Sequence, residues 1–146
     1  MNSLVLGVVK TTLAAATVAA PASYDTVAPQ QAAAAAAPAA SAASAASGSA
    51  QRVAEGMLGR YGWSSGQYSC LYPLWERESG WRVTAENPSS GAYGIPQALP
   101  GSKMASAGPD WRTDAATQIR WGLGYIRGRY GSPCAAWAHE KAHGWY

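Results

Sequence analysis

Residues 67–79 read QYSCLYPLWERES, and this stretch indicates most clearly how the chain folds. Its large apolar residues Leu71, Leu74 and Trp75 recur at spacings of three and four, which places them on one side of an α-helix. Gly80 follows, a residue type that favours the left-handed backbone at which helices end. The pattern therefore predicts an amphipathic helix over residues 67–79 with one face in a hydrophobic core.

Two carboxylates of this predicted helix lie on different faces. With about 100° of rotation per residue and Leu71 set at 0°, Glu78 falls at roughly 340° and Glu76 at roughly 140°. Glu78 therefore lies within the apolar arc and Glu76 outside it. Loss of hydration on the apolar side raises the pKa of a carboxyl group, which suits it to act as a general acid near neutral pH. We expect Glu78 to be a functional acid and Glu76 to be solvated.

The rest of the pattern predicts a mainly α-helical domain. Further helices are expected over residues 50–60, 111–129 and 134–143. Residues 87–100 are rich in Gly, Pro, Ser and Tyr and are expected to form a structured loop. Because no run of β-branched residues alternates with polar ones, little sheet is expected.

The predicted helix over residues 111–129 has a distinct start and an unusual middle. Thr113 is the expected N-cap, with Asp114 in the first turn. Glycine lowers helix propensity, and this helix carries three, at Gly122, Gly124 and Gly128. We expect other parts of the chain to pack closely at these positions.

Composition divides the 146-residue chain into unequal parts. Residues 51–146 contain all seven Trp, seven of the eight Tyr and ten of the eleven Lys and Arg, and carry a net charge of +3 (ten basic minus seven acidic). Residues 23–50 contain fourteen Ala and one charged residue, Asp25. A multi-pass membrane protein, a large α/β enzyme and a two-domain enzyme are thereby excluded.

The N-terminal third is predicted to serve export. Residues 1–22 resemble a secretory signal peptide, with an apolar to neutral stretch after Lys10 and an Ala-Pro-Ala cleavage site. Residues 23–50 lack large apolar side chains and contain Pro29 and Pro38, so a flexible spacer is expected, with a transient helix as the alternative. The folded domain is expected to comprise residues 51–146 and to tolerate removal of residues 1–50.

The two cysteines, Cys70 and Cys134, are interpreted in the same context. In a chain that leaves the reducing cytosol, two distant cysteines favour a disulfide. Two buried thiols or a metal-binding pair are the alternatives.

The residues around Glu78 also resemble a known family. Residues 74–81 (LWERESGW) are followed by Ala85, by residues 87–97 (NPSSGAYGIPQ) and by Pro100. A second set agrees with a later helix of the same family: Asp114, Gln118, Ile119, Gly122, Tyr125 and Ile126. Over about residues 70–137 the chain resembles the lytic transglycosylases with a lysozyme-like fold, in their short secreted form from Gram-positive, actinobacterial-type bacteria. Pro96 departs from the family, which commonly has Met or another apolar residue there.

The resemblance implies cleavage of peptidoglycan glycan strands between N-acetylmuramic acid and N-acetylglucosamine, with Glu78 as the single catalytic residue. Ordinary glycosidases use two carboxylates, and here only Glu86 and Asp110, both in loops, are candidates for a second. In this family the N-acetyl group and the 6-hydroxyl of the substrate replace the nucleophile, which gives a 1,6-anhydro product.

The resemblance also implies the binding residues and the setting. The family's sugar groove maps to residues 91–97, and Tyr93, Gln97, Tyr125 and Trp137 are the candidate sugar contacts, with core packing as the alternative for each aromatic. We expect a monomer that is secreted to the cell wall, binds peptidoglycan glycan strands but neither nucleic acid nor, after signal cleavage, a membrane, and needs no cofactor or metal.

Three other functions fit parts of the sequence. Residues 139–143 match H-E-x-x-H, in which two histidines and a glutamate serve a zinc protease, but a third ligand is required and only three residues follow. A lysozyme that hydrolyses the same bond and a module that binds glycan without cleaving it are the other two.

Overall fold

The computed structural model describes residues 28–146, and the side chains from residue 39 onward. It is mainly helical, with no strands in this region. The four α-helices are α1 (Ala28–Met57), α2 (Tyr68–Ser79), α3 (Ala115–Tyr130) and α4 (Pro133–His143). Short 3-10 helices η1 (Leu58–Tyr61), η2 (Ser65–Gln67) and η3 (Gly101–Ser106) lie between them. The predicted mainly α-helical fold is confirmed.

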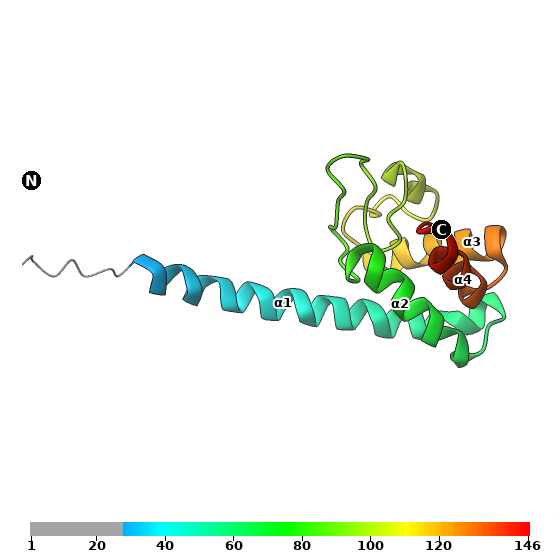
Figure 1. Cartoon of the computed structure of the whole chain (residues 1–146), viewed down its shortest axis with the longest axis horizontal. Coiled ribbons are helices and arrows are strands. Elements are labelled where there is room, and N and C mark those ends of the chain that lie inside the picture. Colours follow the sequence, from blue (N-terminus) through cyan, green and yellow to red (C-terminus); the bar gives the residue numbers. More distant parts are fainter. Residues whose placement is uncertain (1–27) are drawn as a thin grey trace, which may run out of the picture.

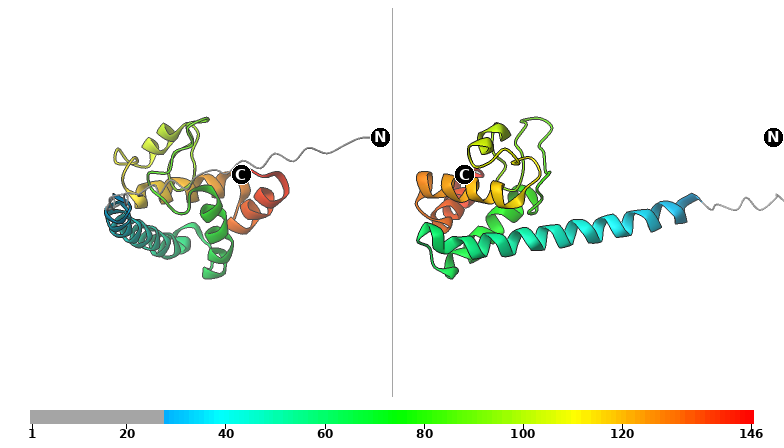
Figure 2. Two further views of the ribbon diagram at one scale, coloured as in Figure 1. Left: turned by 60° about the vertical axis from the view of Figure 1, so that its left-hand side comes forward. Right: turned by 180° about the vertical axis from the view of Figure 1, so that it is seen from behind.

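Helix α1 is a long rod, and only its C-terminal part packs against the other helices (Figures 1 and 2). Ala50, Ala54 and Leu58 are buried in the hydrophobic core, and the Ser47 hydroxyl donates a hydrogen bond of 3.2 Å to the Gly80 carbonyl oxygen. Small side chains let this helix approach α3 and the end of α2 closely.

The expectation of a flexible spacer over residues 23–50 is therefore corrected for residues 28–50, which are helical. Alanine has the highest helix propensity. The helix is stabilised further because its face of small side chains is buried against the rest of the domain. The folded unit accordingly begins before residue 51. The predicted signal peptide, residues 1–22, lies outside the described residues.

The core lies between α2, α3 and the end of α1. Its largest members are Trp75 and Trp81, whose ring centroids are 5.2 Å apart, and the apolar residues Leu71, Leu74, Ile95, Ile119, Leu123 and Ile126. A disulfide between Cys70 and Cys134 joins α2 to α4, as the sequence predicted. Helices α2 and α4 are thus tied by a covalent bond as well as by packing.

Two details of α3 differ from expectation. Its N-cap is Asp114, which accepts a 2.7 Å hydrogen bond from the Thr117 backbone N–H, and not Thr113. A Cβ atom at Gly122 would lie 2.7 Å from the Trp75 ring, so the predicted close packing is confirmed there. At Gly124 and Gly128 no atom lies within 4 Å of such a Cβ, and the prediction is wrong for both.

The loop between α2 and η3 is held in large part by the buried side chain of Gln118. The Gln118 amide oxygen accepts from the Ile95 backbone N–H at 2.8 Å, and its nitrogen donates to the carbonyl oxygens of Val83 and Trp111 at 2.9 and 2.8 Å. Gly94 lies so close that a Cβ there would meet the Gln118 amide at 2.5 Å. The loop is therefore ordered by α3, which fixes the wall of the cavity described next.

Candidate functional site

Glu78 lies in the last turn of α2 on its inner side and is half-buried, whereas Glu76 is exposed on the outer side. The face assignment made from the sequence is thus confirmed. Burial raises the pKa of the Glu78 carboxyl to about 7; the negative charge of Glu140 adds to this, and the Arg77 guanidinium opposes it. At neutral pH a large share of Glu78 therefore carries the proton that a general acid donates.

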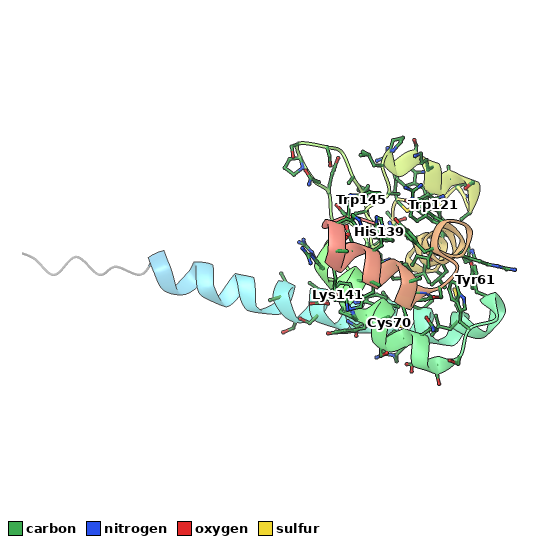
Figure 3. All side chains as sticks on the ribbon, turned by 45° about the vertical axis from the view of Figure 1, so that its right-hand side comes forward. Tyr61, Cys70, Trp121, His139, Lys141 and Trp145 are labelled. Atoms are coloured by element: carbon green, nitrogen blue, oxygen red, sulfur yellow. A yellow bond between two sulfur atoms is a disulfide. The ribbon has the colours of Figure 1, made fainter. Side chains whose placement is uncertain are left out.

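A cavity of about 120 Å³ opens between the loop, η3 and α3. It is lined by Pro96, Gln97, Ala98, Leu99, Lys103, Trp121, Tyr125 and Tyr146. The rings of Trp121 and Tyr125 stack at 5.4 Å with 10° between their planes. Figure 3 labels Trp121, which α3 contributes to this wall. Flat aromatic faces beside polar groups are the kind of surface that binds a sugar.

Tyr146 connects the cavity to the acid. Its hydroxyl accepts a 2.7 Å hydrogen bond from the Trp75 indole N–H and donates one of 3.0 Å to the Pro96 carbonyl oxygen. Burial raises the pKa of the Tyr146 hydroxyl well above its usual value, and the charge of Glu78 adds to the effect. Tyr146 thus lines the cavity and lies close enough to Glu78 to sense its charge.

The cavity wall contains a strained residue. Gln97 has a backbone φ of +49°, in the left-handed region that residues other than glycine rarely adopt. Its amide nitrogen holds the turn by donating hydrogen bonds to the carbonyl oxygens of Ala85 and Gly94 at 3.2 and 2.9 Å. No hydrogen bond to the amide oxygen of Gln97 is formed within residues 28–146, and backbone strain of this kind is found at functional sites.

The structure separates the four predicted sugar contacts. Gln97 and Tyr125 line the cavity together. Tyr93 instead donates its hydroxyl proton to the Arg112 carbonyl oxygen at 2.9 Å and packs edge-on against Trp111. Trp137 packs on the hydrophobic core, with the Lys141 ammonium 5.7 Å from its ring centroid. The cavity residues that the sequence analysis missed include Trp121, whose spacing of four from Tyr125 was the available signal.

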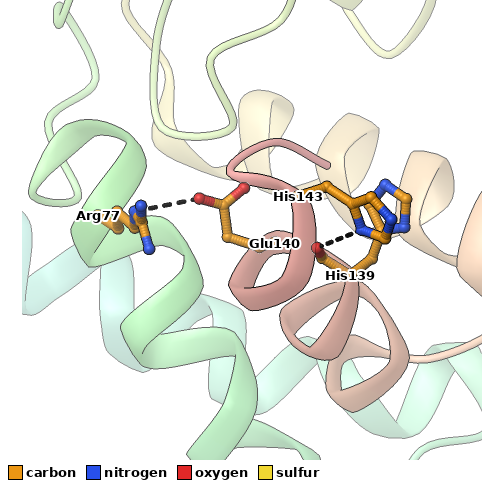
Figure 4. Close-up of polar contacts among 4 residues, drawn as sticks. All are labelled: Arg77, His139, Glu140 and His143. Atoms are coloured by element: carbon orange, nitrogen blue, oxygen red, sulfur yellow. Dashed lines mark hydrogen bonds and ion pairs between the residues drawn. The ribbon is translucent and has the colours of Figure 1, made fainter.

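The carboxylates proposed from the loops are engaged elsewhere or exposed. An Asp110 carboxylate oxygen accepts a 2.7 Å hydrogen bond from the Thr117 hydroxyl, near the start of α3. Glu86 is exposed. The carboxylate whose charge acts on Glu78 is that of Glu140 in α4, the glutamate of the H-E-x-x-H segment. Glu140 is only 2% exposed and pairs with Arg77 of α2, its Oε1 atom lying 3.1 Å from the Arg77 Nε atom (Figure 4).

The H-E-x-x-H segment lies in α4, with its two histidines and its glutamate on different sides of the helix (Figure 4). The rings of His139 and His143 stack at 4.1 Å, and Trp145 packs against His139 at 4.4 Å. Glu140 points from the other side of α4 toward α2 (Figure 4). Among the described residues no group of three or more His, Cys, Asp or Glu could hold a metal ion.

No protein-family model, curated protein or solved structure matches this chain. Within residues 28–146, no helix is long and apolar enough to cross a membrane.

Proposed function

We propose that the protein is a secreted peptidoglycan lytic transglycosylase in which Glu78 is the only catalytic carboxyl group. The observation that carries the proposal is a half-buried carboxyl with a pKa of about 7, whose charge reaches Tyr146 in the wall of a cavity that holds stacked aromatic rings. The disulfide fits an oxidising compartment outside the cell. The net charge of +3 favours approach to an anionic wall polymer.

The reaction follows from a single acid. Protonated Glu78 donates its proton to the glycosidic oxygen, and the bond from this oxygen to C1 of N-acetylmuramic acid breaks. The N-acetyl carbonyl oxygen of the same sugar bonds to C1 in its place. The Glu78 carboxylate then removes the proton of the 6-hydroxyl, whose oxygen attacks C1 and releases the N-acetyl oxygen. Glu78 ends protonated and the product is a 1,6-anhydro sugar.

The burial of Glu140 favours this reaction over hydrolysis by the common two-carboxylate mechanisms. These mechanisms use a second carboxylate at the sugar or at the attacking water. Glu140 is 2% exposed, and its unpaired oxygen is buried, so neither oxygen is free to contact a sugar. A substrate that supplies its own nucleophile does not need the second group.

The comparison of Glu78→Gln with Glu76→Gln tests the proposal. Glutamine keeps the shape of Glu78 but has no proton to donate, so turnover of purified peptidoglycan should fall by about 10²–10⁴ while binding to it is retained. Glu76 is exposed on the same helix, and its variant should turn over substrate like the wild type. Equal turnover by Glu78→Gln and the wild type would falsify the catalytic assignment.

A further inference from the structure

Glu140 is a buried carboxylate with an incomplete set of partners. Its Oε1 atom pairs with the Arg77 Nε atom at 3.1 Å, while its Oε2 atom is buried and accepts no hydrogen bond. A buried carboxylate oxygen without a donor is costly to stability. The proposed reaction does not use this group, so the burial of a charge at this position calls for another explanation.

The position of the Glu140 charge is fixed by helix packing. Glu140 lies in α4, Arg77 lies in α2, and the Cys70–Cys134 disulfide joins the same two helices. Arg77 immediately precedes Glu78 in α2. The ion pair therefore holds a charge of α4 next to the turn of α2 that bears the acid (Figure 4).

The two members of the pair act unequally on Glu78. The Arg77 side chain is 57% exposed, so water screens its positive charge, whereas the Glu140 side chain is 2% exposed and is screened little. The Tyr146 hydroxyl, whose pKa is raised in part by the charge of Glu78, is neutral at physiological pH. The pair therefore presents a net negative field to Glu78.

We propose that Glu140 is a positioning residue for Glu78: through its ion pair with Arg77 it fixes a buried negative charge of α4 against the turn of α2 that bears the acid. The inference rests on the proposed function for its biological meaning. The charge of Glu140 raises the pKa of Glu78, and burial of Glu78 raises it further and is the larger cause. Without Glu140, Glu78 loses its proton at lower pH, and less of the enzyme is in the acid form at neutral pH.

The test is a direct titration of Glu78 by ¹³C NMR, in which the carboxyl signal is assigned by its loss in Glu78→Gln. Glu140→Gln removes the charge and keeps the shape. Its Glu78 midpoint should move to lower pH by about 1 pH unit, as expected for loss of a nearby buried like charge. Glu76→Gln, which removes an exposed charge from the same helix, should leave the midpoint nearly unchanged.

An unchanged or raised Glu78 midpoint in folded Glu140→Gln overturns the proposal. Glu140→Met serves as the second variant, since it also removes the buried charge, and the partner that it leaves behind, Arg77, is 57% exposed and stays hydrated. Because the NMR titration needs no substrate, it decides the role of Glu140 even if peptidoglycan is not cleaved. If peptidoglycan is cleaved, the alkaline limb of the kcat/KM profile should move with the NMR midpoint.

Discussion

Gly122 is the point at which α3 touches both the core and the wall of the cavity. A Cβ atom there would lie 2.7 Å from Cζ2 of Trp75 and 3.0 Å from Cβ of Pro96. Trp75 is fully buried and donates to Tyr146, so its ring has little freedom to move. Gly122→Ala must therefore displace either the indole or the loop.

The size of the effect follows from two opposing contributions. Replacing glycine by alanine within a helix stabilises it by about 1 kcal/mol. Overpacking a core costs about 1–3 kcal/mol. Gly124→Ala is the matched control, since it lies in the same helix, is exposed and has no atom within 4 Å of the added Cβ. The helix contribution is the same in both variants, so Gly122→Ala should be less stable than Gly124→Ala by about 1–3 kcal/mol.

Urea unfolding followed by tryptophan fluorescence measures this difference. We expect Gly124→Ala to unfold at higher urea concentration than the wild type, and Gly122→Ala at lower concentration than Gly124→Ala. Coincident transitions of the two variants would refute the close packing of α3 on Trp75.

Three further predictions concern stability. Reduction of the Cys70–Cys134 disulfide should lower the free energy of unfolding by about 4 kcal/mol, because it closes a loop of 64 residues, and two titratable thiols in the native protein would contradict the bond. A chain that begins at residue 51 should be less stable by about 2 kcal/mol than one that begins at residue 40, because it loses a buried helical turn and a hydrogen bond; equal urea midpoints would contradict this. The pKa of Glu78 is near 4.5 in the unfolded chain and about 7 in the folded protein. The contribution of Glu78 to the free energy of unfolding is therefore complete below pH 4.5 and is lost as the pH rises through 7. The stability of Glu78→Gln relative to the wild type should therefore rise between these values, and a constant difference in urea unfolding would count against the raised pKa.

The periodicity of the sequence was sufficient to locate a helix and its buried face where that face carries large apolar residues. It located α2 almost to the residue and separated Glu78 from Glu76. It missed the extent of α1, because the buried face of this helix consists of small residues such as Ala50 and Ala54. Such residues allow close packing but give only a weak hydrophobic pattern. A composition rich in alanine did not distinguish a spacer from a helix with one docked end.

The site was predictable in part. Pro133, Ala136 and Glu140 are the buried residues of α4, and their spacings of three and four were a readable signal that Glu140 faces the core. The contact of Tyr146 with Trp75 spans 71 residues, and no local pattern indicates such a pairing. The residues that link the acid to the cavity therefore required the three-dimensional structure.

The product released from peptidoglycan by the wild-type protein tests the central claim most directly. Mass spectrometry of the soluble muropeptides should show 1,6-anhydro ends, lighter by one water than the hydrolysis product, and none above background with Glu78→Gln. Reducing ends, or no released muropeptide, would contradict a transglycosylase that works with Glu78 alone.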